Sequence, residues 1–226
     1  MTEKAFVKQL SEIFVSEGFL AKKEVGTGYG IADLVIIKKD KVNARHCETR
    51  RKYGQLSKLM SEDYFKVLNY IPDKNSGRDP VDVDYLVGKT HISKSFLRYS
   101  ILRMLEKKKF IKKNYENFYF KINGWMPIAN EVIAIEAKMK DWKRGMFQAN
   151  RYKVFADKVY LAIPSEIEHL VDKTMLRKHN VGLIVLDLER SEKKTLIQAK
   201  TTRVWNVYKK NFALEYFWGR GLLNRS

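Results

Sequence analysis

The chain of 226 residues has a single cysteine, Cys47, and therefore cannot form an internal disulfide bond. One lone thiol is typical of proteins kept in a reducing, intracellular compartment. No apolar run reaches the roughly 18 residues needed to span a membrane, and residues 1–4 lack the pattern of a signal peptide. We therefore expect a cytoplasmic protein without a membrane partner.

Several catalytic signatures are also missing. The four histidines are scattered, and none has a partner at zinc-ligand spacing. The sequence contains no G-x-x-x-x-G-K-[ST] phosphate loop and no G-x-S-x-G elbow. The glycines of residues 26–30 do not follow the GxGxxG pattern either. Zinc sites, nucleotide-binding loops and serine-hydrolase chemistry thus find no support.

Acidic residues are scarce relative to basic ones. The chain has 26 Asp and Glu against 44 Lys and Arg, a formal net charge of +18 at pH 7. Such an excess favours a polyanionic partner, with nucleic acid first and an anionic membrane surface second. Residues 38–130 hold 21 of the basic and 10 of the acidic residues, so +11 of the charge lies in this segment.

Two apolar segments of the chain carry isolated charges. Residues 131–138 read Glu-Val-Ile-Ala-Ile-Glu-Ala-Lys, and in a strand Glu136 and Lys138 would point to the same face. Residues 30–37 form a second apolar run that contains Asp33. If the two strands pair, Asp33 lies beside Glu136 and Lys138. Two carboxylates and a lysine predict a divalent-metal site with a group that handles the attacking water.

The order of periodic segments predicts an α/β fold with a mixed central sheet flanked by helices on both faces. An apolar stripe predicts a helix over residues 3–17, and Ser165 with Glu168 forms a capping box for a helix over 165–178. Another helix is expected from about 141 to 155. Strands are expected over 19–25, 31–37, 131–137, 159–163, 181–186 and 195–199.

Residues 38–130 do not continue this alternation of helices and strands. They predict an inserted domain between the two parts of the core, 1–37 and 131–226. Helices are expected over 48–60 and 61–71, then from the Asp79-Pro80 cap to about Val87, and after Ser93. A hairpin over 110–113 and 118–122 follows. Helices with a short turn before the last, followed by a hairpin, are typical of a winged helix-turn-helix. A purely structural helical insertion is the alternative.

The residues Ala32-Asp33 and Glu136-Ala137-Lys138 resemble the signature of the PD-(D/E)XK nuclease superfamily. Two further features are similar: Glu3 stands where the first helix of that family carries a carboxylate, and Gln148 to Tyr152 matches the Gln-x-x-x-Tyr motif of the branch that includes helicase-associated nucleases. The resemblance covers about residues 1–37 and 131–187. Ala32 replaces the proline of the motif. The long separation of Asp33 from Glu136 requires the inserted domain.

The resemblance implies a restriction-endonuclease-like core and a metal-dependent endonuclease that cuts DNA, duplex or branched. It assigns Mg²⁺, replaceable by Mn²⁺, to Asp33, Glu136 and the backbone carbonyl of Ala137. Glu3 would bind a second metal or the water of the first shell. Lys138 would position or deprotonate the attacking water, with a pKa lowered by burial or by the metal, and Gln148 would orient the site or touch a phosphate. Holliday junction resolvase, restriction and repair roles are all compatible, and the Glu3 helix looks like that of archaeal resolvases.

In the inserted domain, the residues expected to contact DNA bases lie at the start of the helix after Ser93. They are Lys94, Ser95 and Arg98. Lys107, Lys108, Lys109, Lys112 and Lys113 are expected to contact phosphates near the wing, and Tyr152 is a further expected DNA contact.

Other interpretations stay open. Glu136 and Lys138 alone would also suit a strand-end ion pair, and the whole chain would suit a non-catalytic DNA-binding regulator that keeps the nuclease fold. A basic RNA-associated protein is a third possibility. Cutting both strands of a symmetric substrate would favour a two-fold homodimer. The aromatic segment 205–218 is a candidate interface, or it packs on its own domain.

Overall fold

The computed structural model of the protein describes residues 2–28, 30–219 and 222. The chain divides into two compact units: unit 1 comprises residues 1–42 and 129–217, and unit 2 comprises residues 43–128 and 218–226. The sequence had placed the end of the chain with the core. Trp218 groups with unit 2 because its ring centroid lies 4.0 Å from the Arg50 guanidinium and its indole donates to the Leu56 carbonyl. No described helix has the length and apolar character needed to cross a membrane.

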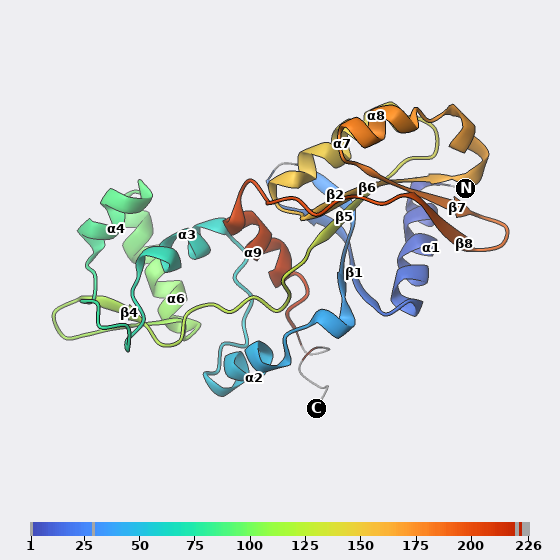
Figure 1. The fold of residues 1–226 in the computed structure, drawn as a ribbon. Coiled ribbons are helices and arrows are strands. Elements are labelled where there is room, and N and C mark those ends of the chain that lie inside the picture. Colours follow the sequence, from blue (N-terminus) through green and yellow to red (C-terminus); the bar gives the residue numbers. More distant parts are fainter. Residues whose placement is uncertain (1, 29, 220–221, 223–226) are drawn as a thin grey trace. The chain divides into compact units, whose positions relative to one another are not determined.

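Unit 1 is built on a six-stranded mixed sheet in the order β1-β2-β5-β6-β7-β8 (Figure 1). The strands β5, β6 and β7 run parallel, whereas the remaining neighbours pair antiparallel. This arrangement confirms the predicted α/β class. The strand bounds are β1 Phe19–Gly26, β2 Ile31–Lys38, β5 Ile133–Ala137, β6 Lys158–Pro164, β7 Gly182–Asp187 and β8 Glu192–Ile197.

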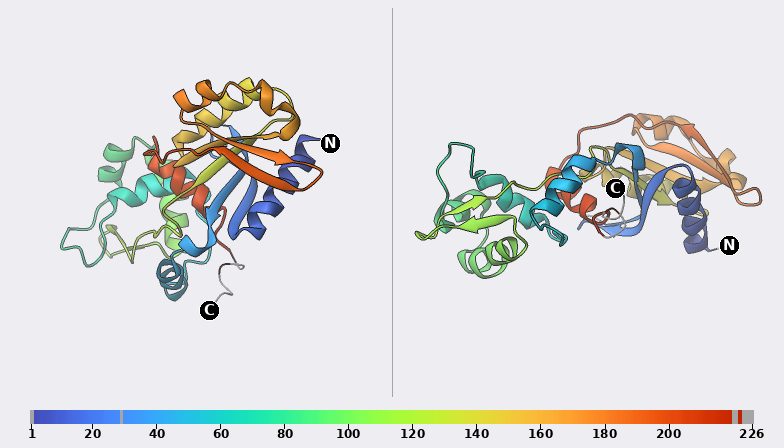
Figure 2. Two further views of the ribbon diagram at one scale, coloured as in Figure 1. Left: turned by 45° about the vertical axis from the view of Figure 1, so that its right-hand side comes forward. Right: turned by 90° about the horizontal axis from the view of Figure 1, so that it is seen from below.

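Helices cover both faces of this sheet (Figures 1 and 2). Helix α1, Glu3–Ser16, is capped by Thr2 and buries Phe6, Leu10 and Phe14 against one face. Its apolar stripe explains this packing, because residues at this spacing share one side of a helix. Helix α7, Trp142–Arg151, packs on β5 and β6 from the opposite side and continues into the 3₁₀ turn Tyr152–Val154. The final helix of the unit, α9, spans Val207–Glu215.

The single helix predicted over residues 165–178 is wrong. The chain forms a 3₁₀ segment, Ser165–Leu170, and then the separate helix α8, Lys173–Lys178. Val171 between them is extended (φ −84°, ψ 125°) and buried, which interrupts the helical hydrogen bonds. Ser165 makes no capping bond; the side chain of Asp172 instead accepts from Met175 N and caps α8.

Unit 2 contains helices and a small two-stranded sheet. Its elements are α2 Ala44–Lys52, α3 Glu62–Tyr70, α4 Val83–Thr90, α5 Lys94–Phe96, a π-helical stretch Leu97–Leu102, α6 Arg103–Lys107, and the strands β3 Ile111–Lys113 and β4 Tyr119–Lys121. The π-helical stretch continues directly from α5 and into α6, so these three form one helical segment with a widened middle. The predicted helix over 48–60 stops early, because α2 ends at Lys52 and Gly54 follows with φ +68°.

The predicted start of a helix at Asp79-Pro80 is also wrong. Val81 exchanges two backbone hydrogen bonds with Tyr119, of 3.1 and 2.7 Å, so the chain is still extended there. Helix α4 begins only after Asp82, whose carboxylate accepts from Tyr85 N at 2.8 Å. Pairing with β4 therefore overrides the local Asp-Pro signal, a common outcome when tertiary contacts compete with turn preferences.

Leu34 is fully buried in β2, whereas Ile31 on the same strand is 62% exposed. We expect Leu34→Ala to lower the free energy of unfolding by about 2–5 kcal/mol, because it leaves a cavity in the core. Ile31→Ala should lower it by only about 1 kcal/mol or less. Urea unfolding followed by circular dichroism measures both. Equal effects for the two variants would contradict the packing of α1 on β2.

Candidate active site

Two strands that are distant in sequence bring the predicted acidic residues together. Strand β2 pairs antiparallel with β5 in a register that sets Leu34 opposite Ile135, and Asp33 and Glu136 are the next positions along the two strands. The Asp33 carboxylate accepts a hydrogen bond from Ala137 N at 2.8 Å. Glu136 is only 2% exposed. The structure thus places Asp33 and Glu136 side by side, as the sequence predicted.

The ammonium of Lys138 joins this pair. Its Nζ lies 2.8 Å from Glu136 Oε1 and 3.2 Å from Glu3 Oε1, at the start of helix α1. It also donates to the Ala137 carbonyl at 3.1 Å. Three of the four groups predicted to bind a metal therefore already converge on one cation, which is the lysine itself.

Tyr152 supports Glu136 from the other side. Its hydroxyl lies 2.5 Å from Glu136 Oε2 and 2.8 Å from the Ile31 carbonyl oxygen. A phenol has one proton to donate, so it bonds Glu136 when that group is ionised and can bond Ile31 when Glu136 is protonated. Burial and the neighbouring Glu136 raise the pKa of Tyr152, which keeps this proton in place. Because Tyr152 is only 2% exposed, its side chain is not available for the predicted contact with DNA, and its hydroxyl bonds Glu136 instead.

Gln148 lies one helical turn before Tyr152 and presents an unsatisfied acceptor. Its side-chain Oε1 is buried and has no hydrogen-bond partner in the described part of the chain. A buried polar atom without a partner is costly, and it commonly marks a place where water, an ion or a ligand completes the structure. This position is compatible with the orienting role predicted for Gln148.

The two carboxyl groups at the centre of the site are held in an environment that disfavours their charge. Burial raises the pKa of Asp33, and the charge of Glu3 adds to this; the Ala137 N–H and Lys138 oppose it without cancelling it. Burial likewise raises the pKa of Glu136, with Asp33 adding to the effect, against the hydrogen bonds from Lys138 and Tyr152. A bound cation would stabilise the charged form of both carboxyl groups.

The predicted lowering of the Lys138 pKa needs correction. Burial does act to lower it, but the hydrogen bond and charge of Glu136, together with Glu3 and Asp33, outweigh burial and raise the pKa. In this arrangement Lys138 is a stable ammonium. It can therefore position water or neutralise charge, but it is a poor base.

The groups that could hold a metal ion are mainly oxygen ligands. In the described ranges, no three His, Cys, Asp or Glu side chains form a group that could hold a metal by themselves. Asp33 and Glu136 do, however, offer hard carboxylate oxygens next to the Ala137 carbonyl. Three carboxylates against one ammonium also leave two formal negative charges in a half-buried site. These features fit a divalent cation such as Mg²⁺ completed by water.

Gly145 is a position beside the candidate site that the sequence reasoning missed. A Cβ atom at this glycine of α7 would lie 2.6 Å from Lys138 Cγ and 2.7 Å from Leu161 Cδ1. The bare glycine therefore makes room for the stem of the catalytic lysine candidate. An isolated glycine inside an amphipathic helix is the signal that could have identified it.

The predicted DNA-contacting residues of unit 2 divide into two groups. Lys94 forms an ion pair with Asp84 at 2.6 Å, and Lys108 donates to the Lys58 carbonyl at 2.6 Å, so both already have protein partners. The others are exposed to solvent, as a phosphate or base contact requires. They are Ser95, Arg98, Lys107, Lys109, Lys112 and Lys113.

Comparison of the chain with protein-family models, with curated proteins and with solved structures finds no match.

Gly145→Ala should push the Lys138 side chain away from Glu136. We expect the variant to be destabilised, although alanine is the better helix former by about 1 kcal/mol. Gly88→Ala in α4 is the matched control, because a Cβ there meets nothing within 4 Å. Thermal unfolding of both variants tests this. A stabilised Gly145→Ala protein would contradict the close approach of Lys138 to α7.

The raised pKa values of Glu136 and Asp33 set the direction of a pH effect. The folded state binds these protons more tightly than the unfolded chain, so stability falls as pH rises from the ordinary Glu value of 4.5 through the raised one. Glu136→Gln removes one such group. In EDTA, we expect its melting temperature to fall less than that of the wild type between pH 4 and pH 8. A steeper fall would mean that the ion pair with Lys138 outweighs the cost of burial.

Proposed function

We propose that the protein is a metal-dependent DNA endonuclease of the PD-(D/E)XK type. The observation that carries this proposal is the meeting of Asp33, Glu136 and Lys138 on two paired strands. A strand-end ion pair alone would explain Glu136 with Lys138. It would not explain why Asp33 is brought against the same backbone, where it accepts from Ala137 N beside the Lys138 ion pairs with Glu136 and Glu3.

Asp33, Glu136 and the carbonyl of Ala137 would hold Mg²⁺, or Mn²⁺ in its place. When bound, the ion would polarise the phosphate and a water molecule and would offset the charge that develops in the reaction. Glu3 pairs with Lys138 at 3.2 Å and its side chain is 47% exposed, so its proposed role is to position the lysine.

Other residues of the protein would position the attacking water and the carboxylate ligands. The Lys138 ammonium would hold the attacking water by a hydrogen bond and neutralise charge on the phosphoryl oxygens, a form of electrostatic stabilisation. Tyr152 would fix the Glu136 carboxylate through its short hydrogen bond. A new bond from the water oxygen to phosphorus would replace the phosphorus–oxygen bond of one strand segment, whose oxygen leaves with a proton. The proton lost by the attacking water would pass to solvent, and solvent would supply the proton taken up by the leaving oxygen.

DNA is the proposed partner of unit 2, which we interpret as a winged helix-turn-helix. Residues 43–128 hold 18 Lys and Arg against 9 Asp and Glu. The helical segment from Lys94 to Lys107 precedes the β3–β4 hairpin, in the order expected for a recognition helix and its wing. Arg98 and Ser95 are exposed near the start of that segment, and Lys112 and Lys113 are exposed in the hairpin.

A non-catalytic DNA-binding protein is the second candidate. It is favoured by one observation: Lys138 is fully engaged with Glu136, Glu3 and Ala137, so the cluster also makes sense as a closed structural network. Cleavage assays separate the two candidates, because only a nuclease needs the acidic residues for more than folding.

The deciding experiment compares cleavage of plasmid, linear duplex, single strand and four-way junction in Mg²⁺, Mn²⁺ or EDTA. We expect metal-dependent cutting by the wild type and a loss of about 100-fold or more in Glu136→Gln. DNA affinity should be unchanged, because Glu136 is buried in unit 1. Glu12→Gln is the matched control, since this exposed α1 residue makes only a 3.9 Å contact with Lys8.

Tight DNA binding with no cutting on any substrate would exclude the nuclease and support the regulator. Cutting that persists in Glu136→Gln but is lost in Glu12→Gln would place the chemistry elsewhere.

A further inference from the structure

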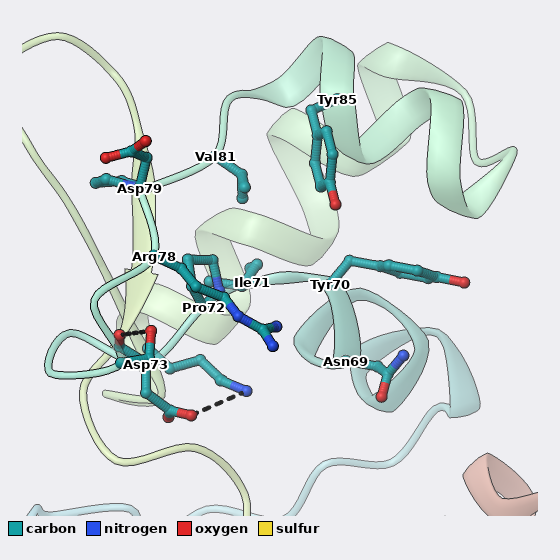
Figure 3. A pocket seen from close by; sticks show the side chains of 12 residues that line it. Asn69, Tyr70, Ile71, Pro72, Asp73, Arg78, Asp79, Val81 and Tyr85 are labelled. Carbon is teal, nitrogen blue, oxygen red and sulfur yellow. Dashed lines mark hydrogen bonds and ion pairs between the residues drawn. The ribbon is translucent and has the colours of Figure 1, made fainter.

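Unit 2 contains a pocket of about 590 Å³ that none of the predicted site residues lines (Figure 3). Its walls come from the end of α3, the loop over residues 71–82, Tyr85 of α4 and Lys121 of β4. This volume lies within the roughly 300–1,000 Å³ of typical small-ligand sites. The pocket is therefore large enough to hold one nucleotide-sized molecule.

The loop that forms one wall is fixed at both ends. Val81 exchanges two backbone hydrogen bonds with Tyr119, and Lys121 N donates to the Pro72 carbonyl at 2.7 Å. Lys74 N donates in turn to the Lys121 carbonyl at 3.0 Å. The wall is thus tied to β4, and the pocket does not depend on an unsupported loop.

Among the residues that the structure describes, one cation that lines the pocket, Arg78, has no ion-pair partner. Lys121 is paired with Asp73 at 3.6 Å, and Figure 3 shows the Asp79 carboxylate turned away from Arg78. Arg78 forms no ion pair with any residue that the structure describes, and its side chain extends along the pocket wall. One uncompensated guanidinium favours an anionic ligand, and its planar fork suits a phosphate.

The other walls suit a flat, polar group. Tyr85 is 44% exposed and extends from α4 toward the pocket (Figure 3), and Tyr70 lines it at the end of α3. Exposed aromatic rings provide stacking surfaces for nucleobases. The neighbouring Asn69 offers an amide donor and acceptor, the combination that pairs with N6 and N7 of adenine.

We propose that this pocket binds a single nucleotide, with its base against the tyrosines and Asn69 and its phosphate on Arg78. Adenine is the expected base. The nucleotide is either a free mononucleotide or an unpaired nucleotide within a DNA strand, because both present the same chemistry. The inference stands on the pocket alone and goes beyond the proposed nuclease activity, so a failed cleavage assay leaves it intact.

The test uses calorimetric titration of the full-length protein with dAMP, dCMP and inorganic phosphate. We expect dAMP to bind more tightly than the other two and Arg78→Ala to weaken it about tenfold or more. Lys74→Ala is the matched control: it removes one positive charge from the same loop, but Lys74 does not line the pocket. Tyr85→Leu should weaken dAMP about tenfold, whereas Tyr85→Phe, which keeps the ring, should bind as the wild type does.

Competition identifies the source of the nucleotide. Displacement of dAMP by a single-stranded adenine oligonucleotide but not by a blunt duplex indicates an unpaired nucleotide in a strand. Displacement by neither indicates a free mononucleotide. Absence of dAMP binding, equal binding of dAMP and phosphate, or equal losses in Arg78→Ala and Lys74→Ala would each overturn the proposal.

Discussion

The pairing of β2 with β5 is the constraint on which the rest of unit 1 depends. It joins residues 104 positions apart, since Asp33 accepts directly from Ala137 N. Closing so long a loop adds little entropy per extra residue, and a folded insertion lowers the cost further by holding its own ends together: Asn43 N donates to the Ile128 carbonyl at 2.8 Å. The sheet can therefore accept a whole inserted unit without losing its register. A slip of one residue would turn Asp33 to the face covered by α1 and separate it from Glu136.

The same pairing creates the electrostatic problem that defines the site. Glu136 lies within a strand that is buried throughout, and burial disfavours its charge even with Lys138 and Tyr152 in contact. A core that needed only stability would be expected to replace such an ion pair by apolar residues, because buried pairs often bring no net stabilisation. Stability alone therefore does not explain the charged cluster, and this agrees with the metal-dependent activity proposed above.

Sequence reasoning succeeded where one pattern had one structural solution. The 3.6-residue stripe of α1 and the apolar runs of β2 and β5 could be buried in only one way, and that placed Asp33, Glu136 and Lys138 together. It failed where tertiary contacts decided between local options, as when pairing of Val81 with β4 moved the start of α4 from Asp79 to Asp82. The direction of the Lys138 pKa shift could not be predicted from the sequence either. It depends on whether burial or the surrounding carboxylates have the larger effect on that pKa. Gly145 and the Arg78 pocket depend on distances between elements, which no linear spacing encodes.

Acidic and basic side chains are unevenly distributed between the candidate site and residues 43–128. The acidic site carries two excess negative charges and by itself would repel a phosphodiester, whereas residues 43–128 carry a surplus of nine positive charges. If the protein binds DNA as proposed, we expect the affinity to come from the basic unit and to weaken as salt rises, because bound counterions are released on complex formation. On the proposed function, chelating the metal ion would affect the acidic site, whereas raising the salt concentration would affect the basic unit. Binding and cutting would then depend on different residues of one chain.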